Sequence, residues 1–313
     1  MSSWRILLTD GLQKAGKEIL DLAASVDDRK GINAEELLLE INNYDAVIVR
    51  GRTKMTDVVI AKAKKLKVIG RCGVGVDNID LQAAKENGTT VVNAPAATTV
   101  SVAELTMGLI FALAREIPRA DAGMKRGEWL KKGLVGVELD KKSLGIIGYG
   151  RIGSRIGKIA VSAGMRINAF DLFLSPETTQ VNGGALLPFD EVIKKSDFIT
   201  IHTPLTETTR NLVNDEVISK MKDGVFIICA ARGGIIDEKA LLDGLKSGKV
   251  AGAALDVYAS EPPTNQELIS HPKVISTPHI AGQTADAQKQ ASIDISTEIL
   301  AGLKGEKLRW KIV

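Results

Sequence analysis

The sequence is poor in the residues on which several classes of protein depend. Aromatic residues make up 4% of the chain, fewer than proteins that stack nucleic-acid bases usually carry. The two cysteines, Cys72 and Cys229, lie in separate apolar runs, which excludes a disulfide framework and favours a reducing compartment. Together with three scattered histidines, they lack the spacing of metal ligands. We therefore predict no nucleic-acid partner and no metal site.

Charge of one sign and long apolar runs are also scarce. The 41 Lys and Arg residues nearly balance the 38 Asp and Glu residues, leaving a formal charge of +3, so a polyanion-binding tail is not expected. The longest apolar stretch, Leu105–Ala114, is too short to cross a bilayer. Since the N-terminus also lacks the basic-then-apolar order of a signal peptide, we expect a soluble, cytoplasmic protein that does not contact a membrane.

What the sequence does contain is a regular alternation of short apolar runs and helical patterns. Runs that are apolar throughout suit parallel strands covered by helices on both faces. The alternation over 313 residues therefore predicts an α/β protein with two doubly wound, Rossmann-like domains. The predicted strands are Arg5–Leu8, Ala46–Val49, Lys67–Gly70, Thr90–Val92, Leu144–Ile147, Arg166–Phe170, Phe198–Ile201, Val225–Ile228, Ala251–Leu255 and Val274–Ser276. Helical patterns cover Gln13–Ala24, Ala34–Asn42 and Asp57–Lys65.

A domain boundary is indicated by the loop Asn93–Thr99, which precedes a long helix over Val100–Arg115. Within that helix Ser101 and Glu104 have the spacing of a capping box. The last helix is predicted over Thr284–Leu303, long enough to run back towards the first domain.

A glycine-rich turn follows the strand that ends at Ile147. Its glycines, Gly148, Gly150 and Gly153, stand between a strand and a helix, the context that a dinucleotide-binding loop requires. They permit a tight turn, a close approach to pyrophosphate and close helix–strand packing, in that order. Asp171 ends the next strand and is placed to accept hydrogen bonds from a ribose diol. Because Asp171 would repel a 2′-phosphate, NAD is predicted rather than NADP.

The candidate acid–base groups are the histidines, since oxidation of an alcohol needs a base near neutral pKa. His271 lies in a polar turn, whereas His202 and His279 each follow a strand, and spacing alone ranks these two level. Arg232 also follows an apolar strand and could hold a carboxylate through two parallel hydrogen bonds. Glu261 precedes two prolines and, taken alone, is typical of a solvated loop.

These motifs occur in the order of the D-isomer-specific 2-hydroxyacid dehydrogenases, a family that essentially the whole chain resembles. The resemblance implies a substrate-binding domain formed by residues 1–97 and 287–313, an NAD-binding domain over 98–286, and a cleft between them. It also implies a homodimer or tetramer through the helix near residues 100–117. The motifs that carry it are Val49–Thr53, Gly73–Asp80, Val102–Leu105, Gly148–Gly153, Asp171, Ala231–Gly234, Asp256–Tyr258, Glu261–Pro263 and Pro278–His279.

The same resemblance implies roles for particular residues. Arg232 would bind the substrate carboxylate, and His279, paired with Glu261, would exchange a proton with the substrate oxygen. A carboxylate beside a histidine favours its imidazolium form, which suits protonation of a ketone. The implied cofactor-binding residues are Val74, Gly148, Gly150, Arg151, Ile152, Gly153, Asp171, Thr203, Pro204, Ala230, Ala231, Asp256, His279, Ala281 and Gly282.

Within the family the chain most resembles the phosphoglycerate dehydrogenases, so we expect a phosphorylated 2-hydroxy acid, 3-phosphoglycerate, as the substrate and serine biosynthesis as the context. Three positions depart from that group: Gly51 replaces a common serine, and Thr98 and Cys229 each replace an asparagine. Two alternatives are a glyoxylate or hydroxypyruvate reductase and a non-catalytic, NAD-sensing corepressor-like protein. The implied substrate-binding residues are Arg50, Arg52, Thr53, Gly73, Val74, Arg232 and, from a neighbouring subunit, Lys131.

Overall fold

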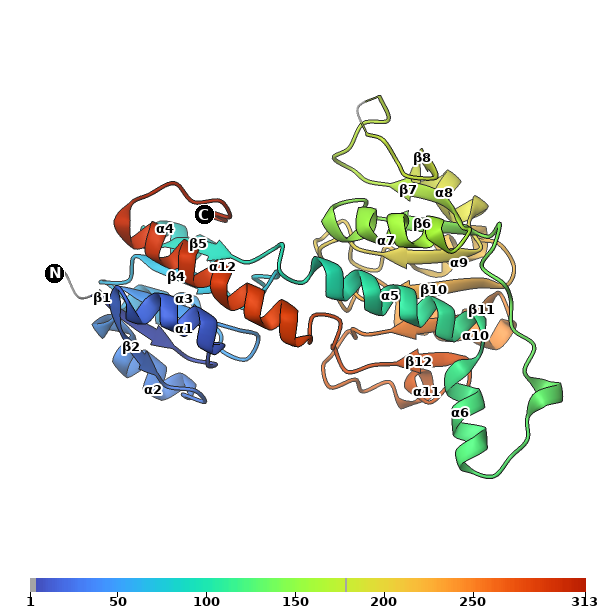
Figure 1. The fold of residues 1–313 in the computed structure, drawn as a ribbon, viewed down its shortest axis with the longest axis horizontal. Helices are drawn as coiled ribbons and strands as arrows, with labels where there is room; N and C mark the ends of the chain where they lie inside the picture. Colours follow the sequence, from blue (N-terminus) through green and yellow to red (C-terminus); the bar gives the residue numbers. More distant parts are fainter. Residues whose placement is uncertain (1–3, 178) are drawn as a thin grey trace. The chain divides into compact units, whose positions relative to one another are not determined.

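The computed structural model describes residues 4–177 and 179–313. The chain divides into two compact units (Figure 1), the first comprising the chain up to Thr98 together with Gln283–Val313, and the second Thr99–Gly282. Each unit is an α/β sandwich around its own parallel sheet, as the alternating pattern predicts. Within the described residues, no helix combines the length and apolar character needed to cross a membrane.

The first unit is built on five parallel strands in the order β2-β1-β3-β4-β5. The order reverses between β1 and β3, and ligands of open α/β sheets bind beside the carboxyl ends of strands at such a switch point. The strands are β1 (Trp4–Leu8), β2 (Ala24–Asp28), β3 (Ala46–Val49), β4 (Val68–Arg71) and β5 (Thr90–Asn93). The helical elements are α1 (Lys14–Asp21), α2 (Ala34–Glu40), η1 (Ile41–Asn43), α3 (Asp57–Lys62), α4 (Leu81–Glu86) and α12 (Ala285–Lys304).

Helices cover both faces of this sheet. On one face Leu20 of α1 and Ile295 of α12 pack with Ile48 of β3. On the other face Leu37 of α2 packs with Val47 of the same strand. Because successive residues of β3 point to opposite, equally buried faces, the strand is apolar at every position.

The second unit holds seven parallel strands in the order β12-β11-β10-β9-β6-β7-β8. Its switch point lies between β6 and β9. The strands are β6 (Ser143–Ile147), β7 (Arg166–Phe170), β8 (Gly184–Leu186), β9 (Phe198–Ile201), β10 (Val225–Cys229), β11 (Val250–Leu255) and β12 (Val274–Ser276). The helical elements are α5 (Thr99–Ala114), α6 (Ile117–Lys125), η2 (Lys131–Gly133), α7 (Arg151–Ser162), α8 (Phe189–Lys195), α9 (Asp215–Lys220), α10 (Glu238–Ser247) and α11 (Gln266–Ile269).

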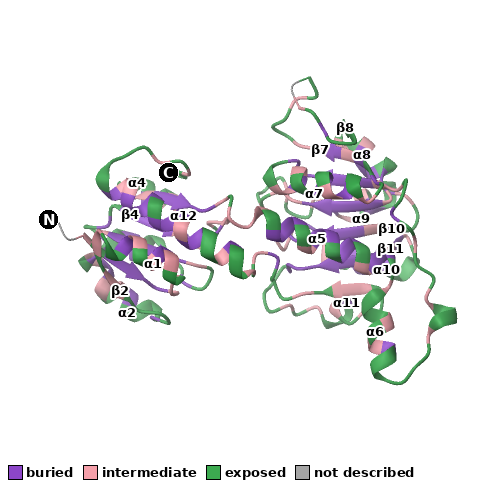
Figure 2. Cartoon of the chain, in the orientation of Figure 1, coloured by how far each residue is buried: buried purple, intermediate pink, exposed green. Residues whose placement is uncertain are grey.

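Two apolar clusters enclose the second sheet. Ile110 of α5 and Ile156 of α7 pack against Ile146 on one face, and Leu241 of α10 packs with Ile147 on the other. Burial is concentrated in the strands of both units, as Figure 2 shows. Outside this sandwich, α6 and the segment after it extend away from the sheet (Figure 1).

The structure differs from the sequence predictions at element ends and at two strands that were not predicted. Ala24, predicted to end a helix, begins β2, and β8 was not predicted either. Both strands lie at a sheet edge and are only partly buried, so neither has a continuous apolar run. α5 begins at Thr99, one residue before the predicted start, so Ser101 lies within the helix and is not its N-cap.

Candidate functional site

The glycine-rich turn joins β6 to α7 at the switch point of the second sheet. Gly148 adopts a φ of +93°, and its amide donates to Phe170 O over 2.8 Å. Gly153 lies so close to the turn that a Cβ there would be 2.2 Å from Gly148 O. Gly150 precedes α7 with open space around its own Cβ position. The turn therefore exposes the helix N-terminus, where free amides and the helix dipole favour an anion.

Further groups around this turn fit a dinucleotide. Asp171 follows β7, and its carboxylate accepts a hydrogen bond from Phe173 N over 2.9 Å, which leaves oxygen lone pairs for a diol. The hydroxyl of Thr203, after β9, is buried without a hydrogen-bond partner among the described residues. A buried hydroxyl of this kind ordinarily finds a partner, and a bound nucleotide would supply one.

His279 and Glu261 meet in the same unit. The Nδ1–H of His279 donates to Glu261 Oε2 over 2.8 Å, and this bond sets the tautomer in which Nε2 remains available to a ligand. The histidine has a φ of +53°, an uncommon conformation for a residue with a side chain. About half of its side chain is exposed, so a small molecule can reach it.

The segment that carries His279 is fixed by the buried carboxylate of Asp256. Oδ1 accepts hydrogen bonds from Thr277 Oγ1 and Ile280 N, and Oδ2 accepts one from Ala281 N. The amide of His279 itself donates to Asp256 O over 2.9 Å. Asp256, predicted as a cofactor contact, thus also holds the histidine segment in its unusual backbone conformation.

His202 lies at the end of β9 and has a different environment. Its Nε2 is 2.8 Å from Thr200 Oγ1, and its Nδ1 is buried. Burial lowers the pKa of His202 to about 3, because a charged imidazolium is poorly stabilised away from water. The ring is neutral near pH 7 and cannot donate a proton as an acid. Spacing alone does not distinguish His202 from His279, but their surroundings favour His279 as the candidate acid–base residue.

Arg232 follows β10 on a turn that is closely packed. Its Nη1 donates to Ala231 O over 2.7 Å. A Cβ on the neighbouring Gly233 would lie 1.7 Å from Tyr258 O, so the Arg232 turn packs directly on the segment that leads to Glu261. Beneath it, Cys229 is fully buried, and burial raises the pKa of its thiol to about 11. The cysteine is therefore an uncharged packing residue.

The substrate-binding residues predicted in the first unit lie at the carboxyl ends of β3 and β4. Arg50 directly follows β3, and Thr53 lies three residues later in the same turn. Gly73 follows β4 with a φ of +146°, and its carbonyl accepts from Ala94 N over 2.9 Å. The carbonyl of Val74 accepts from the Asn93 side chain over 2.7 Å. Both segments are thus ordered by contacts within the unit.

Sequence reasoning did not single out Arg71, the last residue of β4. Its Nη1 donates to Cys72 O over 2.6 Å, and a Cβ on Gly73 would lie 2.1 Å from that nitrogen. The glycine is required there so that the guanidinium can lie against the turn. The signal in the sequence is a basic residue at the carboxyl end of a buried strand, which is where ligands bind in open α/β sheets.

Comparison with known proteins identifies the second unit. Residues 107–281 match the family described as D-isomer specific 2-hydroxyacid dehydrogenase, NAD binding domain. The chain belongs to the D-isomer-specific 2-hydroxyacid dehydrogenase family. The glycine-rich turn, Asp171 and the histidine–glutamate pair are accordingly parts of a family NAD-binding domain, and the cofactor predicted from the sequence is confirmed.

Individual members of the family match almost the whole chain. It is 48% identical to a D-3-phosphoglycerate dehydrogenase of Methanocaldococcus jannaschii over 96% of this chain and 58% of the relative. It is 44% identical to that of Bacillus subtilis over 96% of this chain and 57% of the relative. The chain therefore spans little more than half the length of these curated relatives. A solved glyoxylate reductase from Paecilomyes thermophila is 30% identical, with a TM-score of 0.91 over 100% of this chain and 99% of that one.

Proposed function

We propose that the chain is an NAD-dependent D-3-phosphoglycerate dehydrogenase, which interconverts D-3-phosphoglycerate and 3-phosphohydroxypyruvate at the entry to serine biosynthesis. The reaction class rests on one observation: His279 is held by Glu261 with Nε2 free, in an NAD-binding domain of this family. The substrate rests on the relatives, several of which are D-3-phosphoglycerate dehydrogenases at 43–48% identity.

In this proposal the residues of the second unit move the proton and bind the carboxylate. When bound, NAD would supply the hydride acceptor or donor for C2 of the hydroxy acid. Nε2 of His279 removes the hydroxyl proton during oxidation and returns it to the ketone oxygen during reduction. Glu261 keeps the imidazole oriented and stabilises its charged form. Arg232 binds the carboxylate, which fixes C2 relative to His279.

The cofactor is held by the residues around the glycine-rich turn. The amides of Arg151 and Ile152, at the start of α7, would bind the pyrophosphate, and Asp171 would accept hydrogen bonds from the adenosine ribose. Thr203 would donate its hydroxyl, which has no partner among the described residues, to the cofactor. The remaining cofactor contacts that we propose are Val74, Gly148, Gly150, Gly153, Pro204, Ala230, Ala231, Asp256, His279, Ala281 and Gly282.

In the first unit, the amides of the turn containing Gly73 and Val74 bind the substrate carboxylate. Thr53 lies in the neighbouring turn after β3, which also carries Arg50. Arg50 is the residue that we assign to the phosphate. Guanidinium groups bind phosphate through parallel, charge-assisted hydrogen bonds, and the contacts described for Arg50 are made by its backbone.

The test is a panel of keto acids, with NADH consumption as the readout. We expect kcat/KM for 3-phosphohydroxypyruvate to exceed that for hydroxypyruvate and glyoxylate about 100-fold, as two charge-assisted hydrogen bonds allow. Arg50→Ala should remove most of this preference and leave turnover of hydroxypyruvate nearly unchanged. Arg29→Ala, a change at an exposed arginine paired with Glu40, is the matched control. Equal kcat/KM values for the three acids in the unmodified protein would contradict the proposed substrate.

A glyoxylate or hydroxypyruvate reductase is the second candidate. It is favoured by the likeness to the solved glyoxylate reductase and by the pairing of Arg52 with Asp10 over 2.8 Å, which lowers the positive charge available to a phosphate. A preference for the unphosphorylated acids in the same panel supports this alternative.

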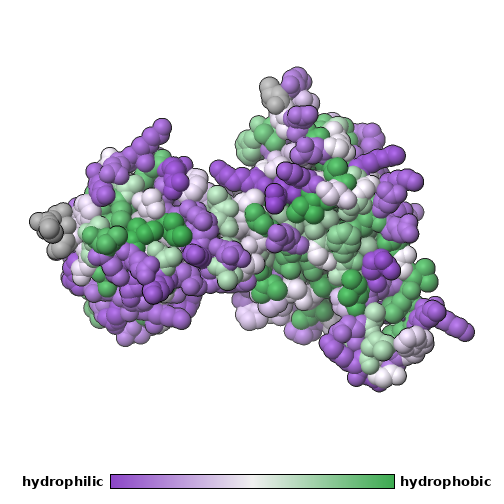
Figure 3. Space-filling model, viewed as in Figure 1, coloured by the Kyte–Doolittle hydropathy of each residue, from purple (hydrophilic) through white to green (hydrophobic). Residues whose placement is uncertain are grey.

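We also propose that two copies of the chain associate through α5 and α6. Large apolar side chains are exposed on these two helices and on the segment that follows them, with Phe111 42%, Ile117 52%, Met124 57% and Trp129 77% exposed. Apolar residues interrupt the hydrophilic surface there (Figure 3), as is common where a partner binds. Lys131, in the exposed η2 turn, would then serve the partner's substrate site. Light scattering should give twice the chain mass of 33.4 kDa; the mass of a single chain at micromolar concentration argues against the dimer.

A further inference from the structure

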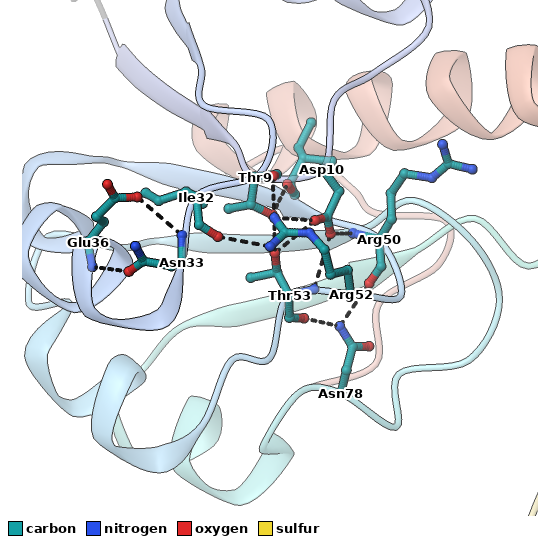
Figure 4. A network of polar contacts seen from close by, with 10 residues as sticks. Thr9, Asp10, Ile32, Asn33, Glu36, Arg50, Arg52, Thr53 and Asn78 are labelled. Atoms are coloured by element: carbon teal, nitrogen blue, oxygen red, sulfur yellow. Dashed lines mark hydrogen bonds and ion pairs between the residues drawn. The ribbon is translucent and has the colours of Figure 1, made fainter. Parts of the chain in front are cut away.

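Arg52 is bound on several sides by its own unit. Its Nη1 donates to Ile32 O over 2.9 Å, and its Nη2 donates to Thr9 O over 2.8 Å. The same Nη2 lies 2.8 Å from Asp10 Oδ1 and donates to Thr53 Oγ1 over 3.2 Å. Figure 4 shows the guanidinium in contact with these acceptors, while 51% of the Arg52 side chain is exposed. Such a guanidinium has few donors left for a ligand.

Asp10 is the centre of these contacts. Its side chain is only 6% exposed, and it follows β1 at the switch point of the first sheet. Besides Arg52, it accepts hydrogen bonds from Arg50 N over 2.7 Å, from Thr53 N over 3.4 Å and from Thr53 Oγ1 over 2.9 Å. A carboxylate so far removed from water needs a compensating charge, which Arg52 provides.

Asn78 binds the backbone carbonyls of the segment that contains Arg50 and Thr53. Its Nδ2 donates to Arg50 O over 2.8 Å and to Thr53 O over 2.6 Å. The segment 50–53 is therefore tied through its amides to Asp10 and through its carbonyls to Asn78. We refer to Asp10, Arg52 and Asn78 as the latch.

The residues on the far side of the latch are held by burial and by a helix cap. Ile32 is 5% exposed and precedes Asn33, the N-cap of α2. Asn33 and Glu36 form a reciprocal capping box, with bonds of 2.9 and 3.2 Å. Arg52 thus connects the segment after β3 to the end of β1 and to the start of α2. In Figure 4 the guanidinium of Arg50 points away from all of these groups.

We propose that Arg52 is a positioning residue: with Asp10 and Asn78 it fixes segment 50–53, so that Arg50 alone of the two arginines binds the substrate's phosphate. The inference rests on the proposed function for the identity of the substrate. It replaces the direct phosphate contact that the sequence resemblance implies for Arg52. The charge of Arg52 is matched by Asp10, whereas the guanidinium of Arg50 points away from these acceptors (Figure 4).

The two roles of Arg52 predict opposite effects of Asp10→Asn. If Arg52 contacted the phosphate, removing the charge of Asp10 would free the guanidinium and lower the KM for 3-phosphohydroxypyruvate. If Arg52 holds the segment, Asp10→Asn weakens the latch and raises that KM. We expect about a tenfold rise for Asp10→Asn and for Arg52→Ala, the size of effect that follows loss of one charge-assisted hydrogen bond. The double variant should be no worse than the poorer single variant, because both changes break the same contacts.

Matched changes test whether the effect is specific. Asp45→Asn removes a carboxylate that accepts from Arg5 N at the opposite end of the same sheet, and it should leave the KM unchanged. Arg52→Lys keeps the charge but not the planar fork, so it should restore only part of the loss. The affinity for NADH should stay constant in every variant, because none of the changed residues is a proposed cofactor contact and all of those contacts except Val74 belong to the other unit.

Hydrogen exchange tests the latch independently of the substrate. The amides of Arg50 and Thr53 should exchange about tenfold faster in Arg52→Ala and Asp10→Asn, since their acceptor is lost or displaced. Unchanged exchange, or a lower KM for the phosphorylated acid in Asp10→Asn, overturns the inference. A substrate panel that favours hydroxypyruvate overturns the proposed substrate and the phosphate role of Arg50, whereas faster exchange would still demonstrate the latch.

Discussion

His279→Gln is expected to lower kcat about 1000-fold, within the range attributed to general acid–base catalysis. Glutamine can accept or donate a hydrogen bond at the position of the imidazole, but it cannot take up or release a proton near neutral pH. The affinity for NADH should fall far less than kcat, because the glycine-rich turn and Asp171 are untouched and His279 is one of many proposed cofactor contacts. The comparison of kcat with the dissociation constant of NADH therefore isolates the proton-transfer role of His279.

The other two histidines provide the controls for this experiment. His271 is in a turn before β12, where its Nδ1 accepts from Lys273 N, and His271→Gln should keep full turnover. His202 is buried beside the cofactor turn, so His202→Gln should weaken NADH binding or stability and leave the proton-transfer step intact. A His279→Gln protein with the turnover of the unmodified enzyme would show that another group is the acid–base residue.

Much of the fold could be predicted from the sequence because central parallel strands bury both faces. Ala46–Val49 and Phe198–Ile201 are buried at every residue, and both were predicted with their observed bounds. The edge strand β2 was missed, since its sequence Ala-Ser-Val-Asp-Asp has no continuous apolar run and presents only Ala24 and Val26 to the core. Pairing with β1 holds it in place, and that pairing is a tertiary effect that a local pattern does not contain.

The parts of the candidate site that depend on local sequence could be predicted, and the parts that depend on contacts between distant segments could not. The glycine-rich turn is local, and the spacing of Gly148, Gly150 and Gly153 specifies its shape. The choice between His202 and His279 needed the structure, because burial and the partner Glu261 depend on segments far apart in the chain. The latch also needed it: Asp10 and Arg52 belong to different strand ends, and no short motif shows that they meet.

Gly150→Ala and Gly153→Ala are expected to damage the enzyme in different ways, although they place the same methyl group three residues apart. A Cβ at Gly153 would lie 2.2 Å from Gly148 O, a backbone atom held between β6 and α7. The turn must then shift, at a cost of about 1–3 kcal/mol for an overpacked site. We expect a loss of several degrees in Tm, measured by calorimetry, with weaker NADH binding as a consequence.

A Cβ at Gly150 meets nothing within 4 Å, and its φ of −76° suits any residue. Gly150→Ala should therefore keep the Tm of the unmodified protein. The methyl group would occupy the space through which the backbone approaches the pyrophosphate, so the dissociation constant of NADH should rise about 10–100-fold. A large loss of Tm in Gly150→Ala, or unchanged NADH affinity, would contradict the placement of the pyrophosphate at this turn. The two variants thus separate what the turn contributes to folding from what it contributes to binding.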